Sequence, residues 1–304
     1  MRMEIGRMGM QSKRRIMLTL TIVLLLTSAA AADEGMWMPQ SISRLPQDVM
    51  RSYGLELSPE QIYDPAGNGL ANAVIRLNGA SASFVSAAGL IVTNHHVAHY
   101  AIQQNSTAEH NYVRDGLVTH SRQEEIPAKN YRAHVLLHIT DVTERVLAGT
   151  EEIADPLQRF QHIEKNQKSI LTEAEKQANT WNEIKGIFAG KQYFLYTYLE
   201  LKDIRLVFAP PESIGAYGGD TDNWMWPRHA GDFAFLRAYV APDGTPAEYA
   251  PENVPYQPKK FFTVSTQGVH AGDFTMIMGY PYRTERYLSS FALANQAEFY
   301  YPWR

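Results

Sequence analysis

Short apolar runs with alternating or β-branched residues recur along the chain, at 73–77, 82–86, 90–93, 135–142, 193–199, 204–209 and 233–240. Runs of this kind, bounded by Gly, Pro, Asn and Asp, are typical of β-strands. In the connection 87–89, Gly89 suits the left-handed position of a hairpin with a bulge. The pattern therefore predicts a mainly β fold, closer to a barrel or sandwich than to a parallel α/β sheet.

Other stretches depart from this strand pattern. Apolar residues from Leu157 to Phe188 recur mostly at steps of three and four, which predicts one or two helices inserted at about 154–189. Ser58-Pro59-Glu60-Gln61 predicts the start of a short helix. After a Pro-rich linker, Phe261–Ser265 and Phe274–Met278 predict a further set of strands.

Composition narrows the class of protein. The 304 residues are 45% hydrophobic, which is enough for a sizeable core, and the net charge is −4 with no basic stripe. This balance argues against nucleic acid as the main partner. Cysteine is absent, which excludes disulfides, thiol chemistry and cysteine-ligated metal from these residues.

The N-terminus has the pattern of an export signal. Basic residues ending at Arg15 precede an apolar run from Ile16 to Thr27, and Ala30 and Ala32 form an A-x-A cleavage pattern. We expect a signal peptide over 1–32, although a membrane anchor is the alternative. The 17 residues from Ile16 to Ala32 are short for a span of about 20, so no membrane attachment is expected after cleavage.

The segment Ser83-Phe84-Val85-Ser86 to His95-His96-Val97 predicts a hairpin that delivers a histidine at the end of an apolar strand. A general base needs such a rigid support, although two histidines that simply cap a strand are the alternative. The segment resembles the surroundings of the catalytic His in trypsin-like double-barrel peptidases. The resemblance assigns that role to His96, which Val97 follows, rather than to His95.

A catalytic His needs a carboxylate that fixes its tautomer. Asp232 precedes the strand-like run Phe233–Val240 and resembles the triad Asp of the same peptidases. The order His, Asp and then Ser fits that fold, and the predicted helical insert explains the gap of 136 residues between the two. An Asp that caps a strand or turn is the alternative.

The run Gly218-Gly219-Asp220-Thr221-Asp222-Asn223-Trp224-Met225-Trp226-Pro227-Arg228-His229-Ala230-Gly231-Asp232-Phe233 closely resembles the signature of peptidase family S46, the bacterial dipeptidyl peptidases 7 and 11. Further matching stretches are Gly35-Met36-Trp37, Glu124-Glu125-Ile126-Pro127, Asp141-Val142-Thr143 and Met278-Gly279-Tyr280-Pro281. The resemblance extends from about residue 35 to the end of the chain. Ala80 and Val97 stand where the family usually has cysteines, and Tyr282 replaces a usual glycine.

The resemblance implies a trypsin-like (chymotrypsin-fold) double β-barrel. Its expected parts are a first barrel with the helical insert over 33–255, the first strands of an incomplete second barrel over 256–285, and the start of a truncated α-helical domain over 286–304. The family's nucleophilic Ser sits in a later G-x-S-G-type turn, and no such turn occurs here. This predicts that the chain is a fragment and inactive alone.

Family S46 enzymes release dipeptides from the free N-terminus of peptides, in the periplasm or at the cell surface of Gram-negative bacteria. The resemblance implies that Asn223 and Trp224 hold the substrate's ammonium group, through a hydrogen bond and a cation–π contact. For Trp226 we expect packing within the loop. The resemblance also implies a homodimer of the full-length enzyme and no cofactor.

Two other classes of function stay open. The chain could be a catalytically inactive module that binds peptide N-termini. It could also be a metal-dependent hydrolase, because His95, His96, His99 and His110 are dense, although no HExxH pattern accompanies them. We expect no metal. Asp220-x-Asp222-Asn223 has an even weaker likeness to a calcium loop.

Overall fold

The fold is taken from a computed structural model that describes residues 37–219, 221, 226–281 and 288–303. The chain divides into two units, Met1–Met38 and Pro39–Arg304. In the first unit only Trp37 and Met38 are described, so the expected signal peptide over 1–32 lies outside the described residues. The architecture below is that of the second unit.

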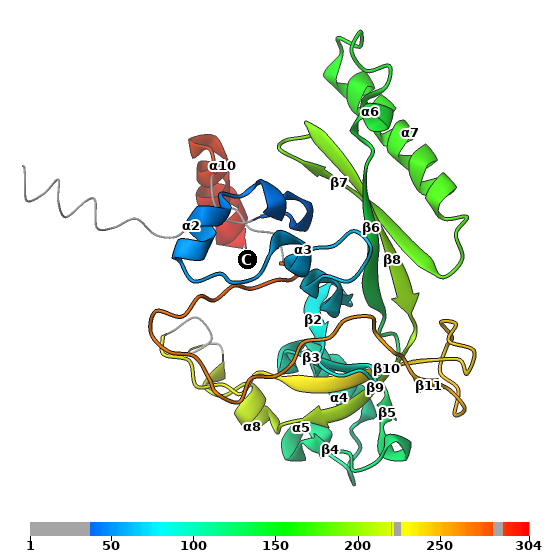
Figure 1. The fold of residues 1–304 in the computed structure, drawn as a ribbon, viewed down its shortest axis with the longest axis vertical. Helices are drawn as coiled ribbons and strands as arrows, with labels where there is room; N and C mark the ends of the chain where they lie inside the picture. The colour runs from blue at the N-terminus through cyan, green and yellow to red at the C-terminus, as the bar shows by residue number, and fades with distance from the viewer. Residues whose placement is uncertain (1–36, 220, 222–225, 282–287, 304) are drawn as a thin grey trace, which may run out of the picture. The chain divides into compact units, whose positions relative to one another are not determined.

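Antiparallel strands dominate the described residues and form one eleven-stranded sheet (Figure 1). The hydrogen-bonded order is β4-β9-β10-β3-β2-β1-β6-β8-β7, with β11 on β10 and β5 on β9. The strands are β1 (Val74–Leu77), β2 (Ala80–Phe84), β3 (Leu90–Thr93), β4 (Leu117–Val118), β5 (Ile126–Pro127), β6 (Ala133–Asp141), β7 (Thr180–Ile187), β8 (Gln192–Leu201), β9 (Asp203–Ala209), β10 (Ala234–Val240) and β11 (Val254–Pro255). The predicted mainly β fold is confirmed at this level, and the double-barrel form stays a prediction.

Helical segments are mostly short. They are η1 (Pro39–Arg44), α2 (Gln47–Ser52), α3 (Pro59–Ile62), η2 (Leu70–Ala73), α4 (His95–Asn105), α5 (Tyr112–Asp115), η3 (Arg122–Glu124), α6 (Thr143–Leu147), α7 (Pro156–Ala174), α8 (Glu212–Gly215), α10 (Ser290–Asn295), the π-helical η4 (Gln296–Tyr300) and η5 (Tyr301–Trp303). The predicted start at Ser58 is confirmed, because Ser58 and Gln61 form a capping box. No helix among the described residues combines the length and apolar character needed to cross a bilayer.

Two tight turns fix the register of the strands that lead to the site. Asn78 and Gly79, at φ 46° and 92°, connect β1 to β2, and Leu77 pairs with Ala80. Gly89 has φ 67°, as predicted for the β2–β3 hairpin. A Cβ at Gly89 would lie 2.7 Å from the carbonyl oxygen of Tyr256, so close packing as well as conformation requires glycine there.

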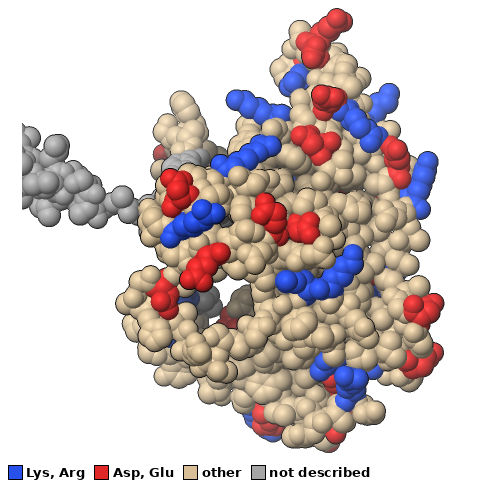
Figure 2. Space-filling model, in the orientation of Figure 1, with Lys and Arg blue, Asp and Glu red and all other residues tan. Residues whose placement is uncertain are grey.

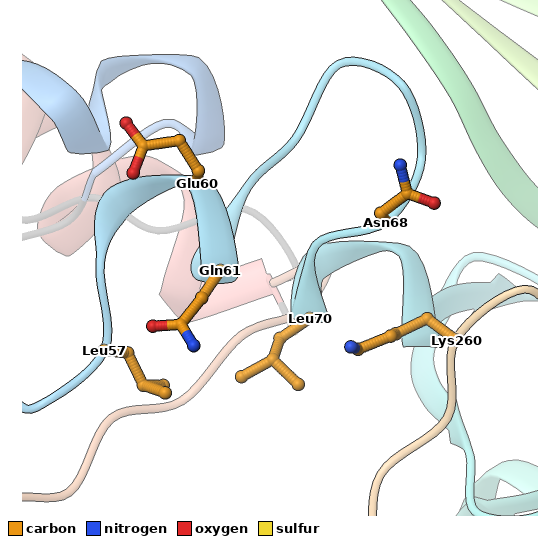
Figure 3. Close-up of a pocket in the computed structure, with 6 residues that line it drawn as sticks. All are labelled: Leu57, Glu60, Gln61, Asn68, Leu70 and Lys260. Carbon is orange, nitrogen blue, oxygen red and sulfur yellow. The ribbon is translucent and has the colours of Figure 1, made fainter.

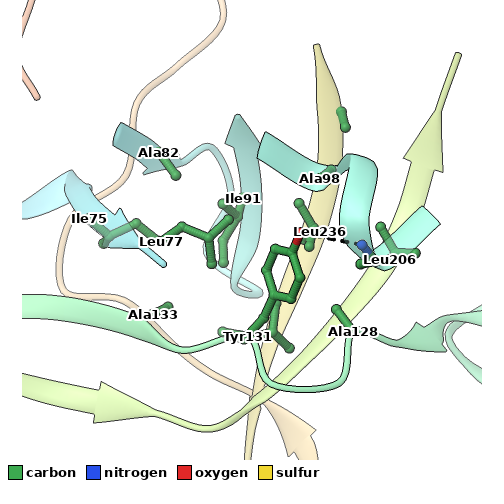
Figure 4. Close-up of a cluster of buried hydrophobic side chains, with 14 of the residues drawn as sticks. Ile75, Leu77, Ala82, Ile91, Ala98, Ala128, Tyr131, Ala133, Leu206 and Leu236 are labelled. Carbon is green, nitrogen blue, oxygen red and sulfur yellow. Dashed lines mark hydrogen bonds between the residues drawn. The ribbon is translucent and has the colours of Figure 1, made fainter. Parts of the chain in front are cut away.

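The main core packs the sheet against α4 (Figure 4). Ile91 of β3, Leu236 of β10 and Ala98 of α4 are fully buried members of this cluster. Tyr131 is buried with them, and its hydroxyl donates to the carbonyl oxygen of Val97 at 2.7 Å, so the one polar atom of this side chain is satisfied. The core therefore holds α4 rigidly at the end of β3.

A second cluster joins α6 and α7 to β8, through Val146, Ile170 and Tyr193. Only the first half of the predicted helical insert is helical. Residues 180–187 form β7, which pairs with β8 along its whole length from Thr180↔Leu199 to Ile187↔Gln192, so the helical prediction for them is wrong. The continuous ladder provides hydrogen-bond partners for the backbone groups of β7 that face β8. This stabilisation outweighs the helical preference indicated by the three-residue spacing of the apolar side chains.

The strands predicted at 261–265 and 274–278 do not form. Both segments run without a ladder, and Phe262 N donates to Phe84 O at 2.8 Å as a single bond to β2. A strand requires a neighbour that takes up its backbone bonds in a repeated ladder, and neither segment has such a ladder with a described strand. From Ser290 onward the described chain is helical, while its assignment to a separate domain stays a prediction.

Acidic and basic side chains are interspersed on the face of the molecule shown in Figure 2. Ion pairs also join segments that are distant in the sequence, such as Arg132 with Glu248 at 2.9 Å and Arg76 with Glu183 at 3.1 Å. No large single-sign field covers this face, so its charges give no reason to expect electrostatic steering of a polyanion to it.

Candidate active site

His96 is placed by the junction of β3 and α4. β3 ends at Thr93, Asn94 is the N-cap in extended conformation, and α4 starts at His95. Thr93 also pairs with Ala234 at the start of β10. Because Asp232 lies two residues before Ala234, this pairing brings Asp232 beside the first turn of α4, although Asp232 follows His96 by 136 positions in the sequence.

Both carboxylate oxygens of Asp232 are held by this turn. Oδ2 lies 2.8 Å from His96 Nδ1, and Oδ1 accepts from the backbone N–H of His96 at 3.0 Å. Asn94 Nδ2 donates to Oδ2 and to the backbone carbonyl of Asp232, both at 3.1 Å. Asp232 therefore replaces Asn94 as the side-chain cap of α4 and at the same time orients the imidazole ring.

The helix favours a negative charge at this point. The backbone N–H of His96, in the first turn of α4, points at the carboxylate, and the helix dipole adds to that attraction. The Asp232 side chain is 31% exposed and that of His96 is 72% exposed. A neutral ring that donates Nδ1–H to Asp232 has its lone pair on Nε2, which is the arrangement that a general base requires.

His95, the residue next to His96, has the opposite environment. It is 1% exposed, and burial followed by the neighbouring His99 lowers its pKa. His99 Nε2 lies 3.4 Å from Glu212 Oε1 of α8. Across the described residues no group of three His, Cys, Asp or Glu side chains has the arrangement of a metal site, although His95, His96 and His99 are close in the sequence.

The loop between α8 and β10 is described only in part. Asn223 and Trp224, the predicted substrate-binding residues, lie outside the described residues. Trp226 is 89% exposed, so the expectation that it packs within the loop is wrong. The adjoining described residues 227–230 are exposed as well.

Two shallow cavities occur elsewhere. A cavity of about 330 Å³ is lined by Leu57, Glu60, Gln61, Asn68, Leu70 and Lys260 (Figure 3). A second, of about 650 Å³, lies between the end of α4 and α8 and includes Thr107, Arg114 and Glu212. Neither of these two cavities is lined by His96 or Asp232.

The structure also gives a role to Glu125, whose importance the sequence did not reveal. Its side chain is 2% exposed and accepts from Arg237 Nε at 2.9 Å and from Tyr239 Oη at 2.7 Å. Arg237 Nη1 also donates to the carbonyl oxygen of Ala88 in the β2–β3 turn. The network therefore ties β10 to the hairpin that carries His96. Glu125 lies in Glu124–Pro127, one of the stretches that resemble the peptidase family, but that resemblance gave Glu125 no particular role.

Comparison with known proteins identifies the class. The model of the family Peptidase S46 matches residues 32–304. The chain belongs to this family, as the resemblance of its 218–233 run predicted.

Individual relatives make the likeness more specific. The chain is 40% identical over 286 residues to dipeptidyl-peptidase 7 of Capnocytophaga gingivalis, covering 94% of this chain and 40% of that protein. It is 42% identical over 289 residues to the Asp/Glu-specific dipeptidyl-peptidase of Shewanella putrefaciens, covering 95% and 39%. A crystal structure of Porphyromonas endodontalis DPP11 in complex with the dipeptide Arg-Glu matches with a TM-score of 0.81 at 38% identity, over 88% of this chain and 39% of that one. The chain thus spans about two-fifths of the length of these relatives.

Proposed function

We propose that this chain supplies the general base and its orienting acid to a serine-type dipeptidyl peptidase, with His96 as the base and Asp232 as the acid. The observation that carries the proposal is the bond of 2.8 Å between His96 Nδ1 and Asp232 Oδ2. The names of the relatives, all dipeptidyl-peptidases, supply the reaction class.

In the proposed reaction, His96 Nε2 takes the proton from a serine hydroxyl as its oxygen attacks the scissile carbonyl. The same nitrogen then gives that proton to the leaving amine, so the ring returns to its starting state. Asp232 stays ionised, holds the Nδ1–H tautomer and stabilises the imidazolium formed between the two steps. No described serine hydroxyl is hydrogen-bonded to His96, so we propose that the chain by itself does not turn over.

The proposed substrates are peptides with a free N-terminus. Asn223 and Trp224 are proposed to hold the α-ammonium group, which would count off two residues from the N-terminus. The family resemblance supports this assignment. An amide oxygen accepts from an ammonium donor, and an indole face attracts a cation within about 6 Å.

The remaining proposals also rest on sequence and family. We propose export through a signal peptide over 1–32 to the periplasm or cell surface of a Gram-negative bacterium. We further propose a trypsin-like barrel arrangement and a homodimer for the full-length enzyme. N-terminal sequencing of the exported protein tests the cleavage site, and a mature start near Asp33 is expected.

A chimera tests the catalytic roles directly. Residues 37–281 replace the aligned part of the Capnocytophaga gingivalis dipeptidyl-peptidase 7, and release of dipeptides from a chromogenic substrate is measured. We expect turnover in the chimera and a loss of about 10⁴-fold in kcat for Asp232→Asn, with His96→Ala at least as severe. A folded chimera without turnover, or a His96→Ala variant that keeps its rate, would contradict the proposal.

The chain alone separates the proposed function from its alternatives. With residues 33–304 we expect no hydrolysis, with or without added zinc, and hydrolysis blocked by a serine-directed inhibitor would refute that expectation. Dipeptide binding without hydrolysis, measured by calorimetry and lost in Asn223→Ala, would favour an inactive peptide-binding module instead.

A further inference from the structure

His95 stands next to the proposed base but faces the interior. It is the first residue of α4, it is 1% exposed, and its ring is among the largest fully buried side chains of the chain. Its neighbour on the same helical turn, His96, is 72% exposed. The two adjacent histidines therefore have opposite environments, and the proposed mechanism uses only His96.

The ring of His95 is the surface on which α8 rests. A Cβ built on Gly215, the last residue of α8, would lie 2.5 Å from His95 Nδ1 and 2.7 Å from Cδ2. Real Cβ atoms do not approach so closely, so only glycine lets the backbone of α8 lie directly on the imidazole. The second contact between α4 and α8 is His99 Nε2 with Glu212 Oε1, at 3.4 Å.

α8 in turn holds the residue that precedes Asp232. The carbonyl oxygen of Ile214 accepts from Gly231 N at 2.8 Å. The Cγ2 atom of Ile214 would be 2.8 Å from a Cβ on Gly231, so a side chain at this position would force Ile214 to move. Ile214 and Gly231 are thus held together, and Asp232 is the next residue.

These contacts form one chain of support. The geometry points to His95 as a positioning residue for the proposed catalytic pair: its ring seats α8, and α8 holds Gly231 so that Asp232 reaches His96. The inference rests on the proposed function for its catalytic meaning, but the positioning itself is a property of the described residues. Burial lowers the pKa of His95. The imidazole that supports α8 is therefore neutral near neutral pH and places no second charge beside Asp232.

The tautomer of His96 is the readout, since only a correctly placed Asp232 selects the Nδ1–H form. Ring-nitrogen chemical shifts of His96, from long-range ¹H–¹⁵N correlation spectra of the full chain at a pH where the ring is neutral, report this form. Asp232→Ala supplies the reference for an unheld ring. His95→Ala and Gly215→Ala are each expected to move the His96 shifts toward that reference, the first by removing the seat and the second by pushing α8 off it.

Two further variants separate this role from a general loss of packing. His95→Phe keeps a ring of similar shape and is expected to keep the wild-type shifts. The double variant His95→Ala with Gly215→Ala is expected to lie closer to wild type than Gly215→Ala alone, because the space left by the imidazole accepts the new methyl group. Gly244→Ala is the control for backbone strain alone, because Gly244 has φ 85° but a Cβ there meets nothing within 4 Å, so this variant is expected to keep the wild-type His96 shifts.

Wild-type His96 shifts in folded His95→Ala or Gly215→Ala would overturn the inference. So would a His95→Phe variant that loses the tautomer as fully as His95→Ala. If the single alanine variants do not fold, as their amide spectra would show, the phenylalanine and double variants decide.

In the active chimera, His95→Ala is expected to lower kcat about 10²-fold with little change in KM. An inactive chimera with tautomer shifts as expected would refute the proposed function and leave the positioning role intact.

Discussion

The buried ion pair beneath the β2–β3 hairpin makes a strong prediction about stability. Glu125 and Arg237 lie 2.9 Å apart, with side chains 2% and 13% exposed. In Glu125→Ala, the guanidinium loses its buried counter-charge and the hydroxyl of Tyr239 loses its acceptor. Removing one partner of a buried pair costs about 3–5 kcal/mol, so we expect the free energy of unfolding to fall by that amount.

The chain offers a matched control in Glu248, which is also 2.9 Å from an arginine, Arg132, but is 66% exposed. Exposed pairs contribute about 0.2–1 kcal/mol, so Glu248→Ala should have a small effect. Both variants are measured by urea unfolding followed by circular dichroism, with unchanged m-values as a requirement. Equal losses in the two variants would refute the reasoning, because burial would then not determine the cost.

A double-mutant cycle sharpens the same test. Arg237→Ala added to Glu125→Ala removes the uncompensated charge, so the double variant should be less destabilised than the sum of the two single variants. The pKa of Tyr239 is raised by burial first and then by its bond to Glu125, so this tyrosine stays a neutral donor throughout the working pH range. Additive single effects would mean that the two side chains do not share one network.

Three further predictions concern other parts of the fold. Gly89→Ala should lower the melting temperature more than Gly79→Ala, because both have positive φ but only Gly89 has backbone atoms within 3 Å of a Cβ. Phe84→Ala, at a fully buried position of the core, should cost about 3–5 kcal/mol in denaturant unfolding, and a loss under 1 kcal/mol would contradict the burial. Burial lowers the pKa of His134, so the unfolded chain binds this proton more readily than the folded one. Stability should therefore be full above about pH 6.5 and fall as the pH drops below it, and His134→Phe should flatten that fall in pH-dependent unfolding measurements.

Local pattern was enough for most of the strands and turns. A short β-prone run predicted β3, and alternating apolar residues predicted β10 to within a residue, because one buried face imposes a period of two on such a strand. The left-handed turn at Gly89 and the capping box at Ser58 were equally readable, since each depends on the chemistry of a few neighbouring residues. His96 and Asp232 could be named from their sequence surroundings before any distance was known.

Local pattern failed where distant contacts outweighed it. Trp181 and Ile184 have the spacing of a helical stripe, yet the ladder with β8 makes this segment strand β7. The start of α4 at His95 was not predicted, because its cap is the carboxylate of Asp232, which lies far away in the sequence. Residues 261–265 have strand-like composition, but apart from the single bond of Phe262 N to Phe84 O they form no ladder with a described strand.

The sequence by itself determined the class of this protein and the two residues of the proposed catalytic pair, because residue types at fixed spacing carry that information. The tertiary structure alone decided how the pair is held. The pairing of β3 with β10 closes a gap of 136 residues, and the close approach of Gly215 to His95 depends on two elements packing with no side chain between them. Neither contact leaves a periodic trace in the sequence, since each is a meeting of single residues from distant segments.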